Sequence, residues 1–300
     1  MPERRSLSFL PQGPYDLNAT LTAMGMGRGD PCLRELGAGH VQLAIAAPQD
    51  ALMVEFRWDG REVHAVIEGR DAEWLAPFMP SMLGIDFRPP QFDGPRRLRQ
   101  IAHRFAGLRV ARWPQIFPRV AQTVVQQLVS FHDACHGWRE LVRRHGVPIS
   151  GCDGLIAPPT PATLARMGTC QFVECGILPQ HGRRIASLAR LASRIEAKWK
   201  GGLPSDAMSD TCELLAKLPG IGPWTLGYLR GAGMGYSDAI VLGDYGFPKL
   251  VAYFFGGSED ADDEEMVRLL EPYRPHRFYV LSLIVKSGMS PPRRGPRHRR

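Results

Sequence analysis

The segment Leu218-Pro-Gly-Ile-Gly-Pro-Trp-Thr225 has the residue types that a phosphate-binding turn needs. Because glycine lacks a Cβ atom, Gly220 and Gly222 permit a tight turn and leave backbone N–H groups open to another molecule. Such N–H groups attract anions at the start of a helix, since the helix dipole places positive charge there. The carboxyl residue Asp244 follows about twenty positions later. A carboxylate there either caps a helix or stabilises positive charge as it develops in a reaction.

Helix signals on both sides place these glycines between two helices. Upstream, Asp210 and the glutamate three residues later have the spacing of a capping box, which predicts a helix over 210–218. Pro219 cannot continue that helix, whereas Pro223 suits the first turn of a second helix, predicted over 223–233. The predicted element is a helix-hairpin-helix that binds the DNA backbone.

Three motifs occur together: the hairpin Pro219-Gly-Ile-Gly-Pro-Trp-Thr225, the pair Asp244-Tyr245, and Gln127-Leu-Val-Ser130 upstream. Together they resemble the helix-hairpin-helix (HhH-GPD) DNA glycosylases, most closely the bacterial 3-methyladenine DNA glycosylase II type. The similarity covers roughly residues 90–288. The resemblance implies a monofunctional enzyme of base excision repair. It would flip a damaged base out of double-stranded DNA and hydrolyse the N-glycosidic bond, with alkylated purines such as 3-methyladenine as substrates.

The resemblance also implies roles for individual residues. Asp244 would stabilise the positive charge that develops on the sugar as the base leaves. Leu128 would wedge into the duplex and fill the gap left by the flipped nucleotide. Trp224 and Tyr228 are four positions apart, share a helix face and would line the base pocket. The residues expected to bind DNA are Gln127, Leu128, Gly220, Ile221, Gly222 and Thr225.

The same resemblance specifies the cofactors. Relatives that also cut the DNA backbone carry a lysine nucleophile where this chain has Trp224, so the chain should be monofunctional. The backbone carbonyls of Ala216, Leu218 and Gly220 match positions that bind a monovalent cation, K⁺ or Na⁺. No cofactor should be required. Endonuclease-III-like relatives hold an iron–sulfur cluster with cysteines that follow the catalytic Asp, and here no cysteine follows Cys212, so no cluster is expected.

The chain departs from the resemblance near its last predicted helix. Pro275-His-Arg277 resembles a Pro-Trp-Arg element that opens this helix, and counting along the helix places Val285 where the family has a third pocket aromatic, a Trp. A pocket with one ring fewer offers less stacking surface. We therefore expect weaker activity on hypoxanthine than on 3-methyladenine, whose cationic ring is a good leaving group without help.

Other interpretations fit parts of the pattern. Without the resemblance, Asp244 would be a helix cap, and Asp238 is a rival carboxylate that we interpret as a turn residue. A non-catalytic helix-hairpin-helix DNA-binding protein would explain the hairpin, but not the combination of Asp244 with Trp224 and Tyr228. A glycosylase for another lesion, such as uracil, hypoxanthine or an oxidised purine, is a further alternative.

Charge is distributed unevenly along the chain. The first 90 residues carry 8 Lys and Arg against 12 Asp and Glu, whereas residues 91–150 carry 10 against 3. Basic side chains neutralise DNA phosphates, so the second segment predicts a DNA-binding surface. The arginines expected to form this surface are Arg96, Arg97, Arg99, Arg104, Arg109, Arg112 and Arg119.

Periodicity of apolar residues divides the chain near residue 90. We predict an α+β N-terminal domain over 1–90, a mainly α-helical HhH-GPD glycosylase domain over 91–289, and a basic disordered tail over 290–300. Before the division, strands are predicted at 41–46, 52–58 and 63–67, with a turn at Asp59-Gly60, and a helix at 72–83. After it, helices are predicted at 94–107, 115–130, 131–145, 161–167, 182–198, 210–218, 223–233, 244–255, 262–270 and 275–287.

Composition excludes some classes of protein. Hydrophobic residues make up 44% of the chain, enough for a sizeable core, and no run of eighteen apolar residues suggests a membrane span. The N-terminal residues lack the apolar segment of a secretion signal. We expect a cytoplasmic, nucleoid-associated bacterial protein, monomeric, whose partner is double-stranded DNA with damaged bases and not a membrane.

Overall fold

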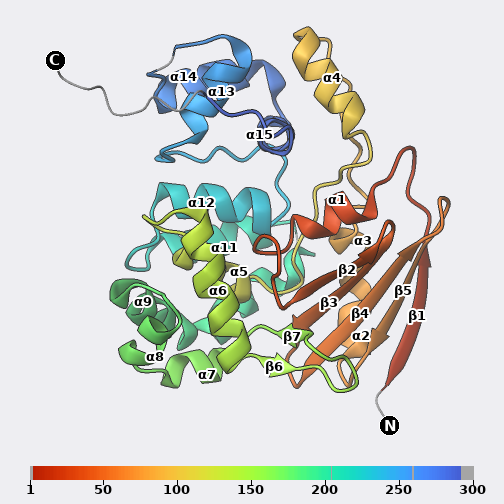
Figure 1. Cartoon of the computed structure of the whole chain (residues 1–300), viewed down its shortest axis with the longest axis vertical. Coiled ribbons are helices and arrows are strands. Elements are labelled where there is room, and N and C mark those ends of the chain that lie inside the picture. The colour runs from red at the N-terminus through yellow and green to blue at the C-terminus, as the bar shows by residue number, and fades with distance from the viewer. Residues whose placement is uncertain (1–2, 204, 259, 292–300) are drawn as a thin grey trace.

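A five-stranded antiparallel sheet and two groups of helices make up the structure (Figure 1). The computed structural model describes residues 3–203, 205–258 and 260–291. In Figure 1 the sheet lies at the lower right, one helix group at the lower left and the other at the top. Most of the predicted basic tail, residues 292–300, lies outside the described residues. Within the described ranges, no helix is long and apolar enough to cross a membrane.

The sheet has the strand order β1-β5-β4-β3-β2. Its strands are β1 (Arg4–Phe9), β2 (Leu33–Gly37), β3 (His40–Ala46), β4 (Ala51–Trp58) and β5 (Val63–Glu68). The three predicted strands are confirmed as β3, β4 and β5, and the predicted turn at Asp59-Gly60 joins β4 to β5. The two edge strands were missed, because their side chains are half-buried or exposed and show little apolar alternation.

One face of the sheet forms a core with short helices from the same part of the chain. Val41, Val54 and Ile67 are buried on this face, since alternate strand residues point to the same side. The helices that cover it are α1 (Leu17–Thr22), α2 (Ala72–Leu75) and α3 (Met79–Met82). The predicted helix at 72–83 is interrupted by a 3₁₀ turn, Ala76–Phe78. The other face contacts the short ribbon of β6 (Val147–Pro148) and β7 (Ile156–Ala157).

The larger helical core surrounds the buried indoles of Trp138 and Trp199. Its helices are α5 (Phe117–Val125), α6 (Phe131–His145), α7 (Pro161–Arg166), α8 (Thr169–Glu174), α9 (Pro179–Ala189), α10 (Ala192–Trp199) and α11 (Ala207–Ala216). The prediction at 131–145 is confirmed as α6, whereas α8 was missed and the predicted helix at 182–198 is divided into α9 and α10.

The smaller helical core surrounds Phe254 and Leu281. It is built by α4 (Arg96–Arg104), α13 (Phe247–Phe255), α14 (Asp263–Leu270) and α15 (Arg277–Lys286). Between the two cores runs α12 (Pro223–Tyr228), continued by a π-helical turn, Leu229–Gly233. Leu229 packs into the larger core, and Trp224 and Tyr228 pack against the smaller one. The region predicted to do chemistry therefore lies where the two helical cores meet.

Candidate active site

The hairpin joins α11 to α12, and its two glycines have different roles. Gly220 has a φ of +80°, which favours glycine, and a Cβ atom there would overlap the guanidinium group of Arg184. Gly222 has an ordinary φ of −99°, and open space lies where its Cβ would be. Gly220 thus makes the turn, and Gly222 leaves the backbone accessible at the start of α12. Because α11 begins at Ala207, the predicted capping role of Asp210 is wrong.

Two residues expected to contact DNA instead hold the hairpin from inside. Gln127 donates from Nε2 to the carbonyl of Gly220 and to the hydroxyl of Thr225, each over 2.9 Å. Its other amide atom accepts a hydrogen bond from Arg184. The side chains of Gln127 and Thr225 are both buried and hold the hairpin, which leaves only their backbone for the predicted DNA contact. The side chain of Ile221 is also buried in the larger core, which leaves only its backbone for a DNA contact.

Leu128 lies beside this network and points out of the protein. Its side chain is 95% exposed, and its φ of +56° is unusual for a residue with a Cβ atom. The chain holds this conformation between the buried Gln127 and Ser130, whose hydroxyl caps α6 by accepting from the N–H of Asp133. An exposed apolar side chain on a fixed, strained backbone has the properties of a wedge, and strain of this kind gathers at functional sites.

Asp244 is held on both of its carboxylate oxygens. Oδ2 accepts from the indole Nε1 of Trp224 over 2.8 Å, and Oδ1 accepts from the backbone N–H groups of Gly246 and Phe247, each over 2.8 Å. The predicted helix at 244–255 begins at Phe247, so Asp244 precedes α13 and still satisfies its first N–H groups. The carboxylate is half-buried, oriented from two sides, and retains acceptor capacity.

Trp224 and Tyr228 stack on each other, with ring centroids 5.6 Å apart and planes inclined by 12°. Their spacing on α12 brings the rings together on one face of the helix. Because the rings already stack on each other, a planar ligand would contact an open face of the pair and would not fit between the two rings. Trp224 therefore makes two contacts: its ring stacks on Tyr228, and its indole N–H orients Asp244.

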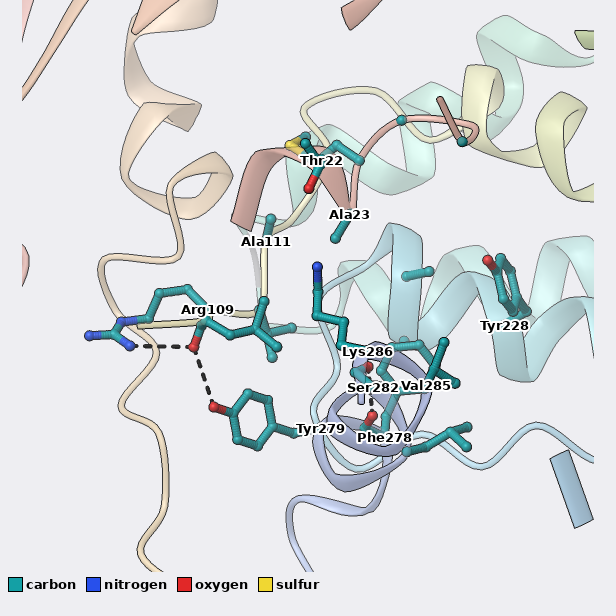
Figure 2. A pocket seen from close by; sticks show the side chains of 18 of the residues that line it. Thr22, Ala23, Arg109, Ala111, Tyr228, Phe278, Tyr279, Ser282, Val285 and Lys286 are labelled. Atoms are coloured by element: carbon teal, nitrogen blue, oxygen red, sulfur yellow. Dashed lines mark hydrogen bonds between the residues drawn. The ribbon is translucent and has the colours of Figure 1, made fainter. Parts of the chain in front are cut away.

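A cavity of about 370 Å³ adjoins Tyr228 of this pair (Figure 2). Tyr228 and Phe247 form one part of its wall, and residues just after α1 form another. The C-terminal half of α15 contributes Ser282, Val285 and Lys286. Val285 is 47% exposed and lines the cavity, so the helix register inferred from the sequence points this side chain to the pocket and not to the core.

Lys286, which the sequence did not single out, extends from α15 toward Ala23 and Ala111 across the cavity (Figure 2). Burial lowers the pKa of its amine, and the negative charges of Asp16 and Glu35 partly oppose this. Within the described part of the chain, the amine has neither a hydrogen-bond partner nor a carboxylate at ion-pair distance. A lysine near a helix end is ordinarily solvated, so no sequence pattern distinguished Lys286. Its position in the cavity wall follows only from how α15 lies relative to α1.

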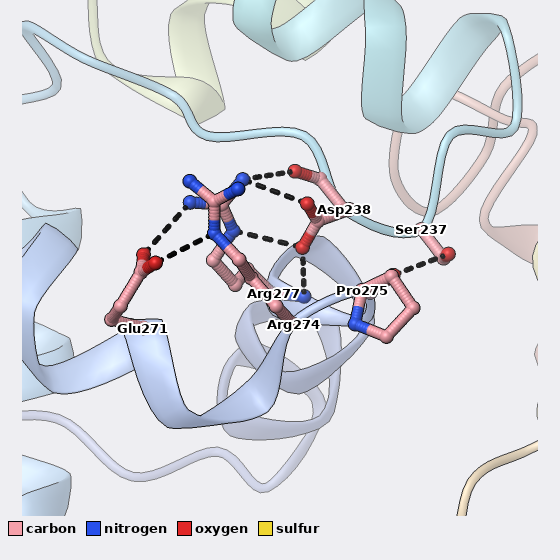
Figure 3. Close-up of polar contacts among 6 residues, drawn as sticks. All are labelled: Ser237, Asp238, Glu271, Arg274, Pro275 and Arg277. Atoms are coloured by element: carbon pink, nitrogen blue, oxygen red, sulfur yellow. Dashed lines mark hydrogen bonds and ion pairs between the residues drawn. The ribbon is translucent and has the colours of Figure 1, made fainter.

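A buried ion pair fixes the start of α15 (Figure 3). Asp238 accepts from Nε and from a terminal nitrogen of Arg277, over 2.8 and 2.7 Å, and Glu271 accepts from the guanidinium group over 3.1 Å. Burial would raise the pKa of Asp238, but hydrogen bonds and charge from Arg277 outweigh it and lower the pKa. The prediction that Asp238 lies in a turn is confirmed, and its carboxylate is engaged in holding α15.

The expected arginine surface is only partly present. Arg96, Arg97, Arg99 and Arg104 are exposed along α4. Arg109 and Arg119 are buried, so their predicted contact with phosphates is wrong. Arg109 donates to the carbonyls of Gln12 and Pro14, and Arg119 donates to the carbonyl of Ala23 over 3.0 Å. Arg112 donates to the carbonyl of Gly202 over 2.6 Å. These three arginines connect segments of the fold, a role that charge patterning cannot distinguish from phosphate binding.

The hairpin carbonyls proposed for a monovalent cation keep acceptor capacity. The carbonyl of Gly220 accepts from Gln127, and that of Leu218 accepts from the N–H of Ile221 over 3.2 Å. A carbonyl oxygen has two lone pairs, so one hydrogen bond leaves a site for a cation. These carbonyls and that of Ala216 are oxygen ligands of the type that the expected K⁺ or Na⁺ would require.

Comparison with known proteins supports the fold and not a particular activity. No protein-family model and no curated protein matches the sequence. A 3-methyladenine DNA glycosylase from Archaeoglobus fulgidus matches over 94% of this chain and 98% of its own, with 21% identity and a TM-score of 0.74. An 8-oxoguanine glycosylase/lyase from Clostridium acetobutylicum matches over 95% and 98%, with 14% identity and a TM-score of 0.68.

A 3-methyladenine DNA glycosylase from Schizosaccharomyces pombe, in complex with abasic DNA, matches over 66% of this chain and 94% of its own. Its identity is 16% and its TM-score 0.52. The match to nearly the whole length of the first two structures includes the sheet as well as the helices. The chain therefore has the fold of these DNA glycosylases.

Proposed function

We propose that this protein is a monofunctional DNA glycosylase that hydrolyses the N-glycosidic bond of damaged purines. The observation that carries the proposal is Asp244, whose carboxylate is oriented by the indole of Trp224 and by the backbone N–H groups of Gly246 and Phe247. These partners connect it to the cavity, because Trp224 stacks on Tyr228, and Tyr228 and Phe247 line the cavity. A structural cap would not need the indole as a partner. A DNA-binding protein without catalysis would not need a carboxylate, a stacked pair and a cavity in one place.

The DNA backbone would be held by the hairpin and by α4. The open backbone at Gly222 would contact a phosphate, and K⁺ or Na⁺ at the hairpin carbonyls would bridge to another. The exposed arginines of α4 would add affinity that decreases with salt concentration. Leu128 would enter the duplex and occupy the space of the extruded nucleotide.

Catalysis would follow from the position of Asp244. The extruded base stacks on the aromatic pair, which recovers part of the cost of leaving the helix. As the bond to the base breaks, the sugar becomes positively charged and the carboxylate stabilises it while orienting a water molecule. Trp224 occupies the position where relatives with backbone-cutting activity have a lysine, so the product would be an intact abasic site.

Two classes of damaged purine are candidates. Alkylated purines such as 3-methyladenine carry a positive charge that makes them good leaving groups, and cationic rings stack well on electron-rich aromatics. Purines with an extra exocyclic carbonyl, such as hypoxanthine or 8-oxoguanine, instead fit the ammonium group in the cavity. Purines of either class could be substrates for the proposed hydrolysis of the N-glycosidic bond.

The experiment is a panel of duplexes, each with one defined lesion, incubated with the purified protein. Release of free base and formation of alkali-labile abasic sites are measured, and borohydride is added to parallel samples. We expect base release from at least one purine lesion, strand breaks only after alkali, and no trapped protein–DNA adduct. Binding of all duplexes without release from any of them would instead support the non-catalytic DNA-binding protein.

A further inference from the structure

One charged group in the cavity wall, the amine of Lys286, has no hydrogen-bond or ion-pair partner within the described ranges. Its neighbours along the wall are mostly apolar, including Phe131, Phe278 and Val285. The other charged residue of the wall, Arg109, directs its guanidinium group to the carbonyls of Gln12 and Pro14. Of the two charged side chains in the wall, Lys286 therefore offers the free N–H donors to a molecule in the cavity.

The ammonium group belongs to a half-buried side chain beside mostly apolar residues, so a hydrogen-bond acceptor held in the cavity would be a favourable partner for it. The nearby acids compensate little: Asp16 caps α1 by accepting from Ala19, and Glu35 accepts from Asn18. The hydroxyl of Ser282 donates to the carbonyl of Phe278 within α15, so it does not compete for the same acceptor. The occupant that best satisfies this cavity has a hydrogen-bond acceptor that reaches Lys286 while its ring contacts the aromatic wall.

From this placement we infer that Lys286 determines base specificity by donating a hydrogen bond to a carbonyl or ring-nitrogen acceptor of an uncharged extruded base, and by repelling a cationic one. The inference rests on the proposed glycosylase function and deepens it. Hypoxanthine and 8-oxoguanine present such acceptors and carry no charge, whereas 3-methyladenine in DNA is cationic. This ranking reverses the one expected from Val285 alone.

A nucleophilic role is the competing use of an unpaired amine. Lys286 lies in α15 and extends toward Ala23 and Ala111, whereas Asp244 is held by Trp224 and is not part of the cavity wall. A nucleophile and the carboxylate must meet at the same sugar carbon, whereas here Lys286 lines the cavity and Asp244 does not. Base recognition requires only that the ring edge reach the lysine.

The test compares wild type with Lys286→Met, which keeps the length of the side chain and removes its charge, and with Lys286→Arg. Single-turnover excision is measured on duplexes with hypoxanthine, 8-oxoguanine or 3-methyladenine. Lys286→Met should slow excision of the two uncharged bases roughly tenfold or more, because a hydrogen bond from a charged donor is lost. It should leave 3-methyladenine unchanged or faster, and Lys286→Arg should retain the wild-type ranking.

Lys198→Met is the matched control, since Lys198 is exposed and pairs with Asp210 on the surface. It removes the same charge outside the cavity and should alter excision of no base. If Lys286→Met slows all three bases equally, or if Lys198→Met produces the same selectivity, the inference is wrong. A borohydride-trapped adduct that forms with wild type and disappears in Lys286→Met would also overturn it, because the lysine would then be a nucleophile.

A second measurement separates this inference from the proposed function. Free hypoxanthine and 7,9-dimethyladeninium, a cation at neutral pH that has no carbonyl group, are titrated into the folded protein, and thermal unfolding confirms that each variant is folded. We expect Lys286→Met to weaken hypoxanthine binding and to leave or strengthen binding of the cation. Unchanged relative binding contradicts the role of Lys286 even if the enzyme excises bases. Loss of selectivity without any excision supports Lys286 and contradicts the glycosylase.

Discussion

The hairpin and the cavity wall are two parts of one candidate site, and they are assembled in opposite ways. The hairpin, with α12 and Asp244, comes from fewer than thirty consecutive residues. The cavity wall combines residues after α1, the segment 108–111 and the last helix α15, which are far apart in sequence. Local residue types determine the first, whereas long-range packing determines the second.

This difference separates two properties of the proposed enzyme. In the proposed function, bond cleavage would depend on Asp244, which the local segment orients through Trp224. The choice of base would depend on Val285 and Lys286, whose positions depend on how α15 packs against the rest of the fold. Changes in the hairpin region should therefore affect every base alike, and changes in the cavity wall should affect the ranking of bases.

Asp244→Asn should have the largest effect on excision. The amide keeps the size of the side chain but cannot stabilise the charge on the sugar, and such a loss raises the barrier by about 3 kcal/mol or more. Excision of every base should fall by two to three orders of magnitude, with DNA affinity nearly unchanged. Single-turnover rates and fluorescence anisotropy measure the two quantities. Wild-type excision by this variant would mean that Asp244 is only a cap.

Arg277→Met should destabilise the folded protein at the start of α15, the helix that contributes Lys286 to the cavity wall. The substitution leaves the carboxylate of Asp238 buried without its partner. Breaking a buried pair in this way costs about 3 kcal/mol of unfolding free energy. Arg274→Met, which removes an exposed arginine paired only with Glu271, should cost less than about 1 kcal/mol. Urea unfolding compares the two variants, and similar losses would contradict the assigned importance of the Asp238 pair.

The same pair has a predicted dependence on pH. Arg277 lowers the pKa of Asp238 below its ordinary 3.8, so the pair stabilises the folded protein above that pH. Its contribution is lost as the pH falls through the lowered folded-state pKa. The difference in stability between wild type and Arg277→Met should therefore be constant near neutral pH and shrink below about pH 4.

Gly220→Ala and Gly222→Ala test the two roles of the hairpin glycines. Alanine at position 220 must adopt a positive φ and displace Arg184, which should cost roughly 1–2 kcal/mol and weaken binding to all DNA. Alanine at position 222 meets open space at an ordinary φ and should leave stability unchanged. Equal destabilisation by both substitutions would contradict the division of roles.

Leu128→Ala should weaken binding to abasic-site DNA by about 1–2 kcal/mol, because less apolar surface fills the gap in the duplex. Binding to undamaged duplex should change much less. Leu128→Gly relieves the positive φ, so it should be at least as stable as the alanine variant while losing the same affinity. If Leu128→Ala weakens binding to abasic-site DNA and to undamaged duplex equally, Leu128 does not act as a wedge.

Val285→Trp should have the smallest effect and act on base ranking. The added ring extends the stacking surface of the cavity, a gain of roughly 0.5–1.5 kcal/mol, so hypoxanthine excision should rise more than excision of 3-methyladenine. Because Val285 is 47% exposed, the fold should accommodate the ring. A lower melting temperature without a gain on hypoxanthine would show that the side chain overpacks its surroundings.

The sequence was sufficient for the hairpin region because its signals are local. Glycine and proline restrict the backbone over a few residues, and residues four apart on a helix share a face. Hence the turn at Gly220 and the shared helix face of Trp224 and Tyr228 could be predicted, whereas the stacking of the two rings on each other was not. The same local reasoning did not reveal that the side chains of Gln127 and Thr225 hold the hairpin, because a polar side chain can satisfy a buried carbonyl or a phosphate equally well.

The remaining features depend on contacts between distant segments, whose free energy no short stretch of residues encodes. Arg109 and Arg119, which we expected to contact DNA, are buried and donate hydrogen bonds to carbonyls within the protein. The tertiary structure placed the amine of Lys286 in a cavity between α15 and the residues after α1. Residue types and spacing thus determined which groups can do chemistry, and the tertiary structure decided which groups face the substrate, because solvation and distance depend on the whole fold.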